Sequence, residues 1–183
     1  MTTPVRIAPA VEADLPGIVE IFNYTAANSI ANFGTRPVSV ADRRDWFGQF
    51  SLAGCHRLFV ARRDGQVMGY AGSQRYRRHE AFSETVEVTI ALQAGCRGQG
   101  VGTALYRDLF SCLADEKIHV ALAGIALPND ASVALHRKFG FTEVGTFCEY
   151  AIKNGQYISS IWMQRVCHPG PPPIRANPCQ LVD

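Results

Sequence analysis

Apolar and polar positions alternate, or recur at helical spacing, along most of the chain. The strand-like runs fall at residues 5–8, 57–61, 66–71, 85–92, 119–127, 141–152 and 157–164. Helical patterns begin near residues 15, 40, 101 and 130. The resulting order β-α-α-β-β-β-α-β-α-β-β predicts an α/β (α+β) domain in which helices cover a mixed sheet.

Short local signals place the ends of these elements. Asp14 is expected to cap the first helix, and Ser39-x-x-Asp42 resembles a capping box for the second. Asp64-Gly65 and Asn154-Gly155 predict tight hairpin turns, and Gly140 is placed to end the fourth helix. The run 119–127 is almost continuously apolar, so we expect a strand that is buried on both faces.

Composition narrows the class of protein. The 183 residues suit one domain, expected at 1–166, followed by a Pro-rich tail at 167–183 without regular structure. A net charge of +2 is too small to indicate nucleic-acid binding. Because no signal sequence and no 18-residue apolar run occur, we expect a cytoplasmic protein with no membrane partner.

The six cysteines are widely spaced and form no Cys-x-x-Cys pair. We expect reduced and mostly buried thiols, with neither a disulfide framework nor a metal site. Cys112 falls in an apolar helical pattern and should be buried. Cys96 is the expected exception, because it precedes a glycine-rich loop.

That loop is the strongest chemical signal in the chain. It follows the strand at 85–92, precedes a helix, and reads Arg97-Gly98-Gln99-Gly100-Val101-Gly102. Backbone N–H groups at such a helix start, together with Arg97, suit a pyrophosphate. The spacing matches neither a Rossmann fingerprint nor a P-loop, and a merely flexible turn is the alternative.

Three further segments accompany the loop: Thr85-Val86-Glu87, the pattern Leu-Pro-Asn-Asp-x-Ser-Val-x-x-His-x-x-x-Gly-Phe at 127–141, and Asn-Phe-x-Thr-x-Pro at 32–37. With them the chain resembles the phosphinothricin and methionine sulfone/sulfoximine N-acetyltransferase group of the GNAT superfamily, from residue 6 to 164. The resemblance implies a GNAT fold, whose mostly antiparallel sheet is flanked by helices and splays at an acetyl-CoA wedge. It also implies acetyl-CoA as co-substrate and a homodimer.

The resemblance implies specific contacts with acetyl-CoA. The main chain of Ile90, Ala91 and Leu92 would pair with the pantetheine arm as an added strand, with one N–H polarising the thioester carbonyl. The glycine-rich loop would hold the pyrophosphate. Further cofactor contacts are expected from Thr103, Asn129, Ser132 and Lys138. Asn129 has a plainer alternative role as a helix cap.

Two residues are expected to take part in the chemistry. Glu87 is the candidate general base, because burial in an apolar strand would raise its pKa toward a useful range. The alternative is a structural carboxylate paired with an arginine. His136 is the candidate acid for the CoA thiolate, and its alternative is a packed, hydrogen-bonded side chain.

The resemblance also places the substrate. Arg77 would clamp a carboxylate or phosphinate in bidentate fashion. The remaining residues expected around the substrate are Phe33, Glu80, Ala81 and Phe82. Departures from the group, such as Ala91 in place of a tyrosine, affect substrate identity more than the acetyl-CoA site.

The sequence therefore predicts an N-acetyltransferase that moves acetyl from acetyl-CoA directly to the amine of a small amino-acid analogue. Two alternatives stay open. A peptide or protein N-terminal acetyltransferase would need an open groove instead of Arg77 and the loop around Phe33. A non-catalytic acyl-CoA sensor would keep the glycine-rich loop but would not need Glu87.

Overall fold

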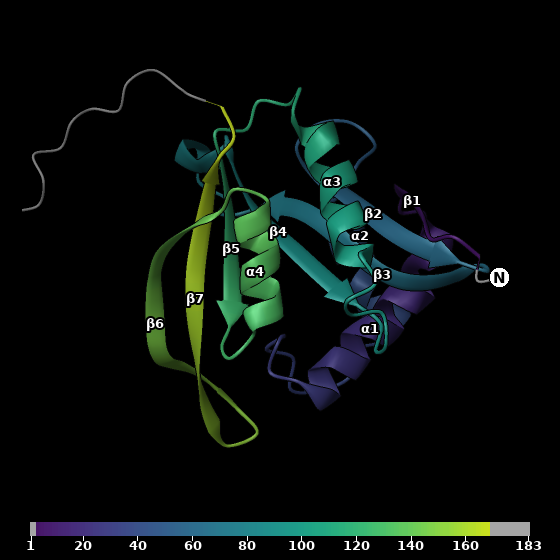
Figure 1. Ribbon diagram of the computed structural model, residues 1–183, viewed down its shortest axis with the longest axis horizontal. Helices are drawn as coiled ribbons and strands as arrows, with labels where there is room; N and C mark the ends of the chain where they lie inside the picture. The colour runs from purple at the N-terminus through teal and green to yellow at the C-terminus, as the bar shows by residue number, and fades with distance from the viewer. Residues whose placement is uncertain (1–2, 169–183) are drawn as a thin grey trace, which may run out of the picture.

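A computed structural model describes residues 3–168 and shows one twisted sheet with helices on both of its faces (Figure 1). The strands are β1 (Arg6–Pro9), β2 (Arg57–Arg63), β3 (Gln66–Arg75), β4 (Thr85–Leu92), β5 (Val120–Ala126), β6 (Thr142–Lys153) and β7 (Gln156–Val166). The helices are α1 (Leu15–Asn28), α2 (Val40–Phe47), α3 (Val101–Leu113) and α4 (Asp130–Lys138), with 3₁₀ turns η1 (Glu12–Asp14) and η2 (Glu80–Phe82). The predicted fold class and element order are confirmed.

The sheet has seven strands in the order β1-β2-β3-β4-β5-β7-β6, and every neighbouring pair is antiparallel except β4 and β5. β4 pairs with β3 throughout residues 86–92, but it pairs with β5 only at residues 85–87. In Figure 1 the arrows of these two parallel strands start side by side and separate toward their tips. The predicted splay is therefore confirmed, and residues 88–92 have one open edge.

Alternation along the strands produces two cores. Phe59 and Ala61 of β2 face the larger core, which holds the buried side of α3 and the start of α4. Leu58 and Val60 face the opposite side, where α1 and α2 pack. Gly102 lets α3 approach α4 and β4, since an added Cβ would lie 3.3 Å from the Leu135 side chain.

Most local signals are confirmed. Ser39 accepts the Asp42 N–H at 3.2 Å, and the Asp42 carboxylate accepts the Ser39 N–H at 2.7 Å. Both hairpin turns place an Asx-Gly pair at positive φ, with 50° and 79° at residues 64 and 65 and 50° and 77° at residues 154 and 155. Gly140, at φ 80°, follows α4 as predicted.

Four expectations need correction. Only one face of β5 is fully buried, because Gly124 is exposed on the other face. Cys96 is buried and Cys112 is exposed, the reverse of what their positions indicated. Asp14 precedes α1 but makes no capping hydrogen bond there.

The described part of the chain holds no helix long and apolar enough to cross a membrane. The predicted domain end at residue 166 coincides with the end of β7. The predicted Pro-rich tail lies outside the described residues from position 169 onward.

Asp14 instead ties the first turn to β2. Its buried carboxylate accepts the Val11 N–H at 2.7 Å and the Arg62 Nε–H at 2.6 Å, with a second bond to the same guanidinium. We expect Asp14→Ala to lower the free energy of unfolding by about 2–3 kcal/mol, because it leaves Arg62 and a main-chain donor without their acceptor.

Urea denaturation with linear extrapolation measures this change. Asp108→Ala is the control, since Asp108 pairs with an exposed Arg107 at the surface and should cost less than about 1 kcal/mol. Equal losses in the two variants would contradict the structural role of Asp14.

Candidate functional site

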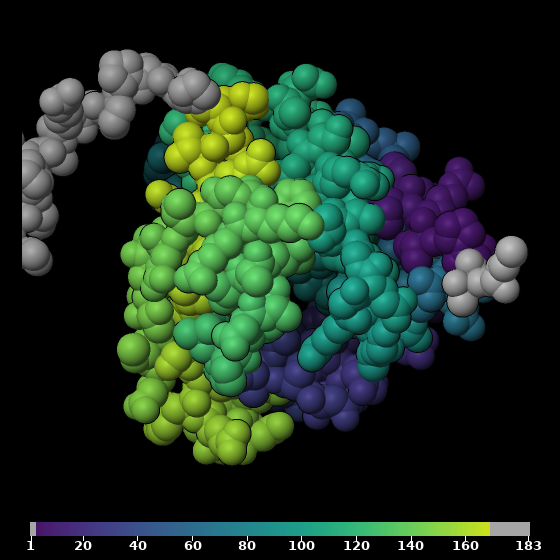
Figure 2. Space-filling model, in the orientation of Figure 1, coloured from purple at the N-terminus to yellow at the C-terminus, as the bar shows by residue number. Residues whose placement is uncertain are grey.

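A cavity of about 310 Å³ lies beside the open edge of β4. Its walls come from α1, α2, β3, β4, the glycine-rich loop and the first turns of α4. In Figure 2 the surface is hollowed between the green atoms of α4 and the teal atoms of the segment that leads into α3. The two parallel strands thus open onto a hollow that a ligand can enter.

The strand edge presents main-chain groups to this cavity. The Gln93 N–H donates to Met68 O of β3 at 2.8 Å, so by alternation the main chain of Ala91 and Thr89 also faces β3. The N–H groups of Ile90 and Leu92 therefore face the open edge. Of the three residues predicted to pair with a pantetheine arm, these two present donors and Ala91 contributes cavity wall.

The glycine-rich loop stands at the N-terminus of α3. Gly98 and Gly100 have φ values of 74° and 78°, and Gly100 is the residue that caps the helix. Nothing lies within 4 Å of a Cβ placed at either position, so both residues border open space on that side. Gln99 folds back and donates to Gly95 O at 2.7 Å. Arg97 lines the cavity next to this loop, and the whole arrangement suits a pyrophosphate.

Behind the loop, Val101 and Gly102 are buried, and neither lines the cavity. Thr103 accepts a 3.5 Å hydrogen bond from Lys138 Nζ across the gap between α3 and α4. Lys138 is exposed and lies outside the cavity. These two residues form a polar link beside the loop rather than part of the cavity wall.

The start of α4 forms the wall opposite β4. Asn129 is its N-cap and accepts the Ser132 N–H at 3.3 Å. Both residues also line the cavity, so the two roles considered for Asn129 coexist. Ala131 and Leu135, which were not predicted as site residues, line the same wall. Their spacing of four residues places them on one face of the helix.

Glu87 lies on the sheet face that carries α1 and α2, directly opposite Gln74 of β3. Burial raises the pKa of its carboxyl above the ordinary value. Among residues 3–168 no arginine forms an ion pair with it, so the structural alternative lacks its partner. Gln74 and Thr89, its neighbours on that face, line the cavity, and a bridging water would connect Glu87 to it.

His136 is almost fully buried, with 3% of its surface exposed. Its Nδ1 lies 2.8 Å from Ser132 O, which can only accept, so Nδ1 carries the proton and Nε2 accepts the Tyr106 hydroxyl at 2.8 Å. Burial lowers its pKa. With both nitrogens engaged away from the cavity, the geometry favours the packed side chain over a catalytic acid.

The residues predicted to bind the substrate do not line this cavity. Arg77 is exposed, and its guanidinium carbon lies 5.0 Å from the Tyr76 ring centre and 5.4 Å from that of Phe82. Glu80 and Ala81 are exposed beside it. Phe33 packs edge-on against Tyr150, with ring centres 6.1 Å apart.

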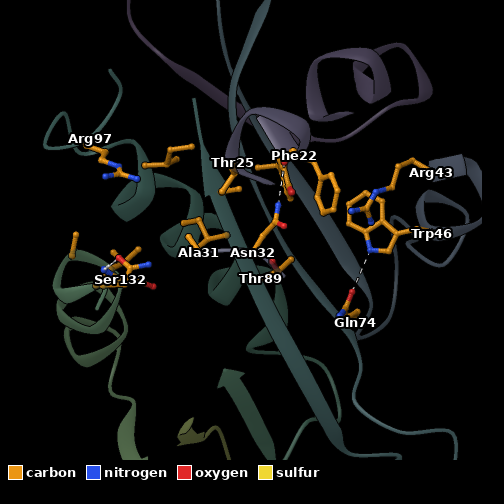
Figure 3. A pocket seen from close by; sticks show the side chains of 17 residues that line it. Phe22, Thr25, Ala31, Asn32, Arg43, Trp46, Gln74, Thr89, Arg97 and Ser132 are labelled. Carbon is orange, nitrogen blue, oxygen red and sulfur yellow. Dashed lines mark hydrogen bonds between the residues drawn. The ribbon is translucent and has the colours of Figure 1, made fainter. Parts of the chain in front are cut away.

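Other residues, missed in the sequence, close the end of the cavity away from the glycine-rich loop. They are Phe22 of α1, Arg43 and Trp46 of α2, and Tyr70 and Gln74 of β3. Figure 3 shows Arg43, Trp46 and Gln74 on one side of the cavity and Arg97 and Ser132 on the other. The capping box at Ser39 was the one signal in the sequence that bore on these residues, because it predicted the start of α2, the helix that carries Arg43 and Trp46.

Lys153 anchors the loop between α1 and α2. This buried side chain donates from Nζ to Ser29 O at 2.8 Å and to Asn32 O at 2.7 Å. Asn32 lines the cavity, and its own Oδ1 accepts the Gly34 N–H at 2.6 Å. The β6–β7 hairpin thereby holds one cavity wall in place. Within residues 3–168 no three His, Cys, Asp or Glu side chains gather as metal ligands.

An open parallel strand edge, a glycine-rich turn at a helix start and a cavity between them define an acyl-CoA-dependent acyltransferase of the GNAT type. The acetyltransferase (GNAT) family matches residues 20–141. The chain is 39% identical over 166 residues to a phosphinothricin N-acetyltransferase of Streptomyces coelicolor, covering 90% of this chain and 97% of the relative.

It is 34% identical to an L-methionine sulfoximine/L-methionine sulfone acetyltransferase of Pseudomonas paraeruginosa, over 83% of this chain and 88% of the relative. Among solved structures it resembles a phosphinothricin acetyltransferase from Sinorhizobium meliloti in complex with acetyl-CoA, with 31% identity, a TM-score of 0.82, and 91% and 89% of the two chains covered. The chain belongs to the GNAT family of acetyltransferases.

The anchor at Lys153 yields a test of the cavity wall. We expect Lys153→Met to speed hydrogen exchange at the N–H groups of Ala31 and Gly34 about tenfold or more, because the loop loses the two hydrogen bonds that hold its carbonyls. Exchange followed by NMR measures this change. Lys117→Met, which removes an exposed lysine, should leave both rates unchanged; equal exchange in wild type and Lys153→Met would refute the anchor.

Proposed function

We propose that this acetyltransferase moves acetyl from acetyl-CoA to the α-amine of a small amino-acid analogue of the phosphinothricin or methionine sulfone/sulfoximine type. The observation that carries the proposal is the single cavity that joins the open edge of β4 to an enclosed, aromatic-lined end. The names of the relatives support the substrate class. The cavity volume of about 310 Å³ suits a small amine better than an extended peptide.

In the proposed reaction, Glu87 first takes a proton from the ammonium of the substrate through a bridging water. The freed nitrogen lone pair then attacks the thioester carbonyl carbon, and the carbonyl electrons move to oxygen. An N–H of Ile90 or Leu92 at the open edge donates to this oxyanion. When the carbonyl re-forms, the C–S bond breaks and the CoA thiolate leaves. The attacking nitrogen then gives up its second proton, and the thiolate takes up that proton, which leaves the amide and CoA thiol.

The acetyl-CoA contacts proposed here follow from the geometry. The open edge of β4 would pair with the pantetheine arm, and the N-terminus of α3 with Arg97 would hold the pyrophosphate. Asn129 and Ser132 would face the arm from α4. His136 is proposed as packing rather than as the thiolate's acid, because both ring nitrogens are hydrogen-bonded inside the core.

We also propose a cytoplasmic homodimer. The β6–β7 hairpin exposes large apolar side chains, with Tyr157 70%, Ile152 61% and Phe147 57% exposed. Exposed apolar groups clustered on one hairpin indicate a surface that another protein covers. The five cysteines of the described region are free thiols, which suits a reducing compartment.

The glycine-rich loop provides a matched pair of variants. Gly100→Ala should raise the KM for acetyl-CoA about tenfold, because a methyl group would enter the space over the helix N-terminus. The positive φ of 78° should also cost about 1 kcal/mol of stability. Gly65→Ala, at φ 79° in the turn between β2 and β3, should cost the same stability with no change in KM. A similar KM in both variants would rule out the loop as the acetyl-CoA site.

The proposed function is tested by release of CoA thiol from acetyl-CoA with methionine sulfone, methionine sulfoximine and phosphinothricin. Wild type should release thiol with at least one of these amines. Glu87→Gln should lower kcat by about 100-fold or more, while acetyl-CoA binding is retained. No release with any of the three, despite tight acetyl-CoA binding, would leave the peptide acetyltransferase and the sensor as the readings to test.

The raised pKa of Glu87 sets the pH dependence. Because burial disfavours the carboxylate, the basic form becomes available only as pH rises through a pKa above the usual Glu value of 4.5. The acidic limb of the kcat profile should therefore rise with pH above that value and disappear in Glu87→Gln. An unchanged limb in the variant would assign the ionisation to another group.

A further inference from the structure

Arg43 is the charged residue at the end of the cavity opposite Arg97. It extends from α2, and its guanidinium carbon lies 3.7 Å from the centre of the Phe22 ring and 5.0 Å from that of Trp46. Burial between these rings lowers its pKa from the usual arginine value, although the group stays charged. No carboxylate among residues 3–168 forms an ion pair with Arg43.

The polar groups described next to this guanidinium, Tyr70 and Gln74, are not anionic. Tyr70 is the nearby titratable group, and burial raises its pKa to about 12, so it stays neutral. Gln74 already accepts the Trp46 Nε1–H at 3.3 Å. A half-buried cation whose face is stacked on aromatic rings, and whose N–H donors meet no acceptor in the described part of the chain, is arranged to receive an anion from a ligand.

The position of Arg43 in the cavity indicates which group of the ligand would carry that anion. Its other end runs along Ile90 and Leu92, where the thioester is proposed to lie, and Thr89 separates the two ends in Figure 3. We infer that Arg43 clamps the α-carboxylate of the amino-acid substrate and so directs the neighbouring amine toward the open edge of β4. The clamp acts on the substrate class proposed above and therefore rests on that function. It gives Arg43 the role that the sequence assigned to Arg77, whose guanidinium lies outside the cavity.

The test compares methionine sulfone with its carboxamide, which keeps the amine and side chain but lacks the carboxylate. Wild type should prefer the acid. Arg43→Met should raise the KM for the acid about 30-fold, with the carboxamide changed less than about threefold, because only the acid loses a charged bidentate partner. Comparing each substrate between enzymes cancels the difference in amine basicity. The KM for acetyl-CoA should stay the same.

Arg77→Met is the matched control and should leave the preference for the acid intact. Arg43→Lys keeps the charge but loses the fork, and it should show an intermediate preference even if Arg43→Met fails to fold. A thermal melt of each variant reports folding. Equal losses on acid and carboxamide would show that Arg43 only packs against Phe22 and Trp46, and would overturn the clamp while the proposed function stands. A wild type that acetylates neither these two compounds nor methionine sulfoximine or phosphinothricin would overturn both the clamp and the proposed function.

Discussion

The parting of β4 from β5 is the constraint on which the rest of the site depends. Pairing of β4 with β5 stops after residue 87. The main-chain donors and acceptors of the following residues of β4 therefore have no partner in β5. Main-chain groups at a partly buried strand edge of this kind are costly unless water or a ligand pairs with them. A thioester arm with amide groups supplies such a partner. In the proposed binding mode, the hydrogen bonds that hold the acetyl donor therefore come from the main chain of β4 and require little from individual side chains.

Packing keeps the two strands apart and places the remaining groups. The first turns of α4 form the cavity wall opposite β4. Asn129 both caps this helix and faces the cavity. Gly102 lets α3 lie close to Leu135 and Ile90, so the glycine-rich loop starts directly beside the open edge. Across the cavity, Lys153 fastens the loop after α1 to a hairpin more than a hundred residues away in sequence. The cavity is thus enclosed by segments from the whole length of the chain.

The parts of the site that depend on local sequence could be predicted. The glycine-rich loop, strand β4 and the cap at Asn129 each follow from a few consecutive residues, and each contributes at least one residue to the cavity wall. Contacts between distant segments could not be predicted. Arg43 has an ordinary helical surface pattern, and only the packing of α2 on α1 and β3 turns it toward the cavity. His136 was a candidate acid in the sequence because its hydrogen-bond partner, Tyr106, lies thirty residues away on another helix. The local sequence therefore did not show that its Nε2 is already occupied.

The placement of positive charge also matters for the base. A guanidinium close to Glu87 would lower the pKa of its carboxyl and weaken it as a proton acceptor. Burial alone shifts this pKa, in the upward direction, and neither Arg43 nor Arg77 counteracts it. The end of the cavity near Arg43 can therefore hold a cation for the proposed substrate carboxylate without lowering the pKa of Glu87, the proposed base on β4. In the proposed complex, that carboxylate would also neutralise the charge of Arg43. The same arrangement of Arg43 and Glu87 would suit any amine substrate with an anionic group on the carbon next to the nitrogen. In such a substrate the anion at Arg43 and the amine near Glu87 and the thioester are only a few bonds apart.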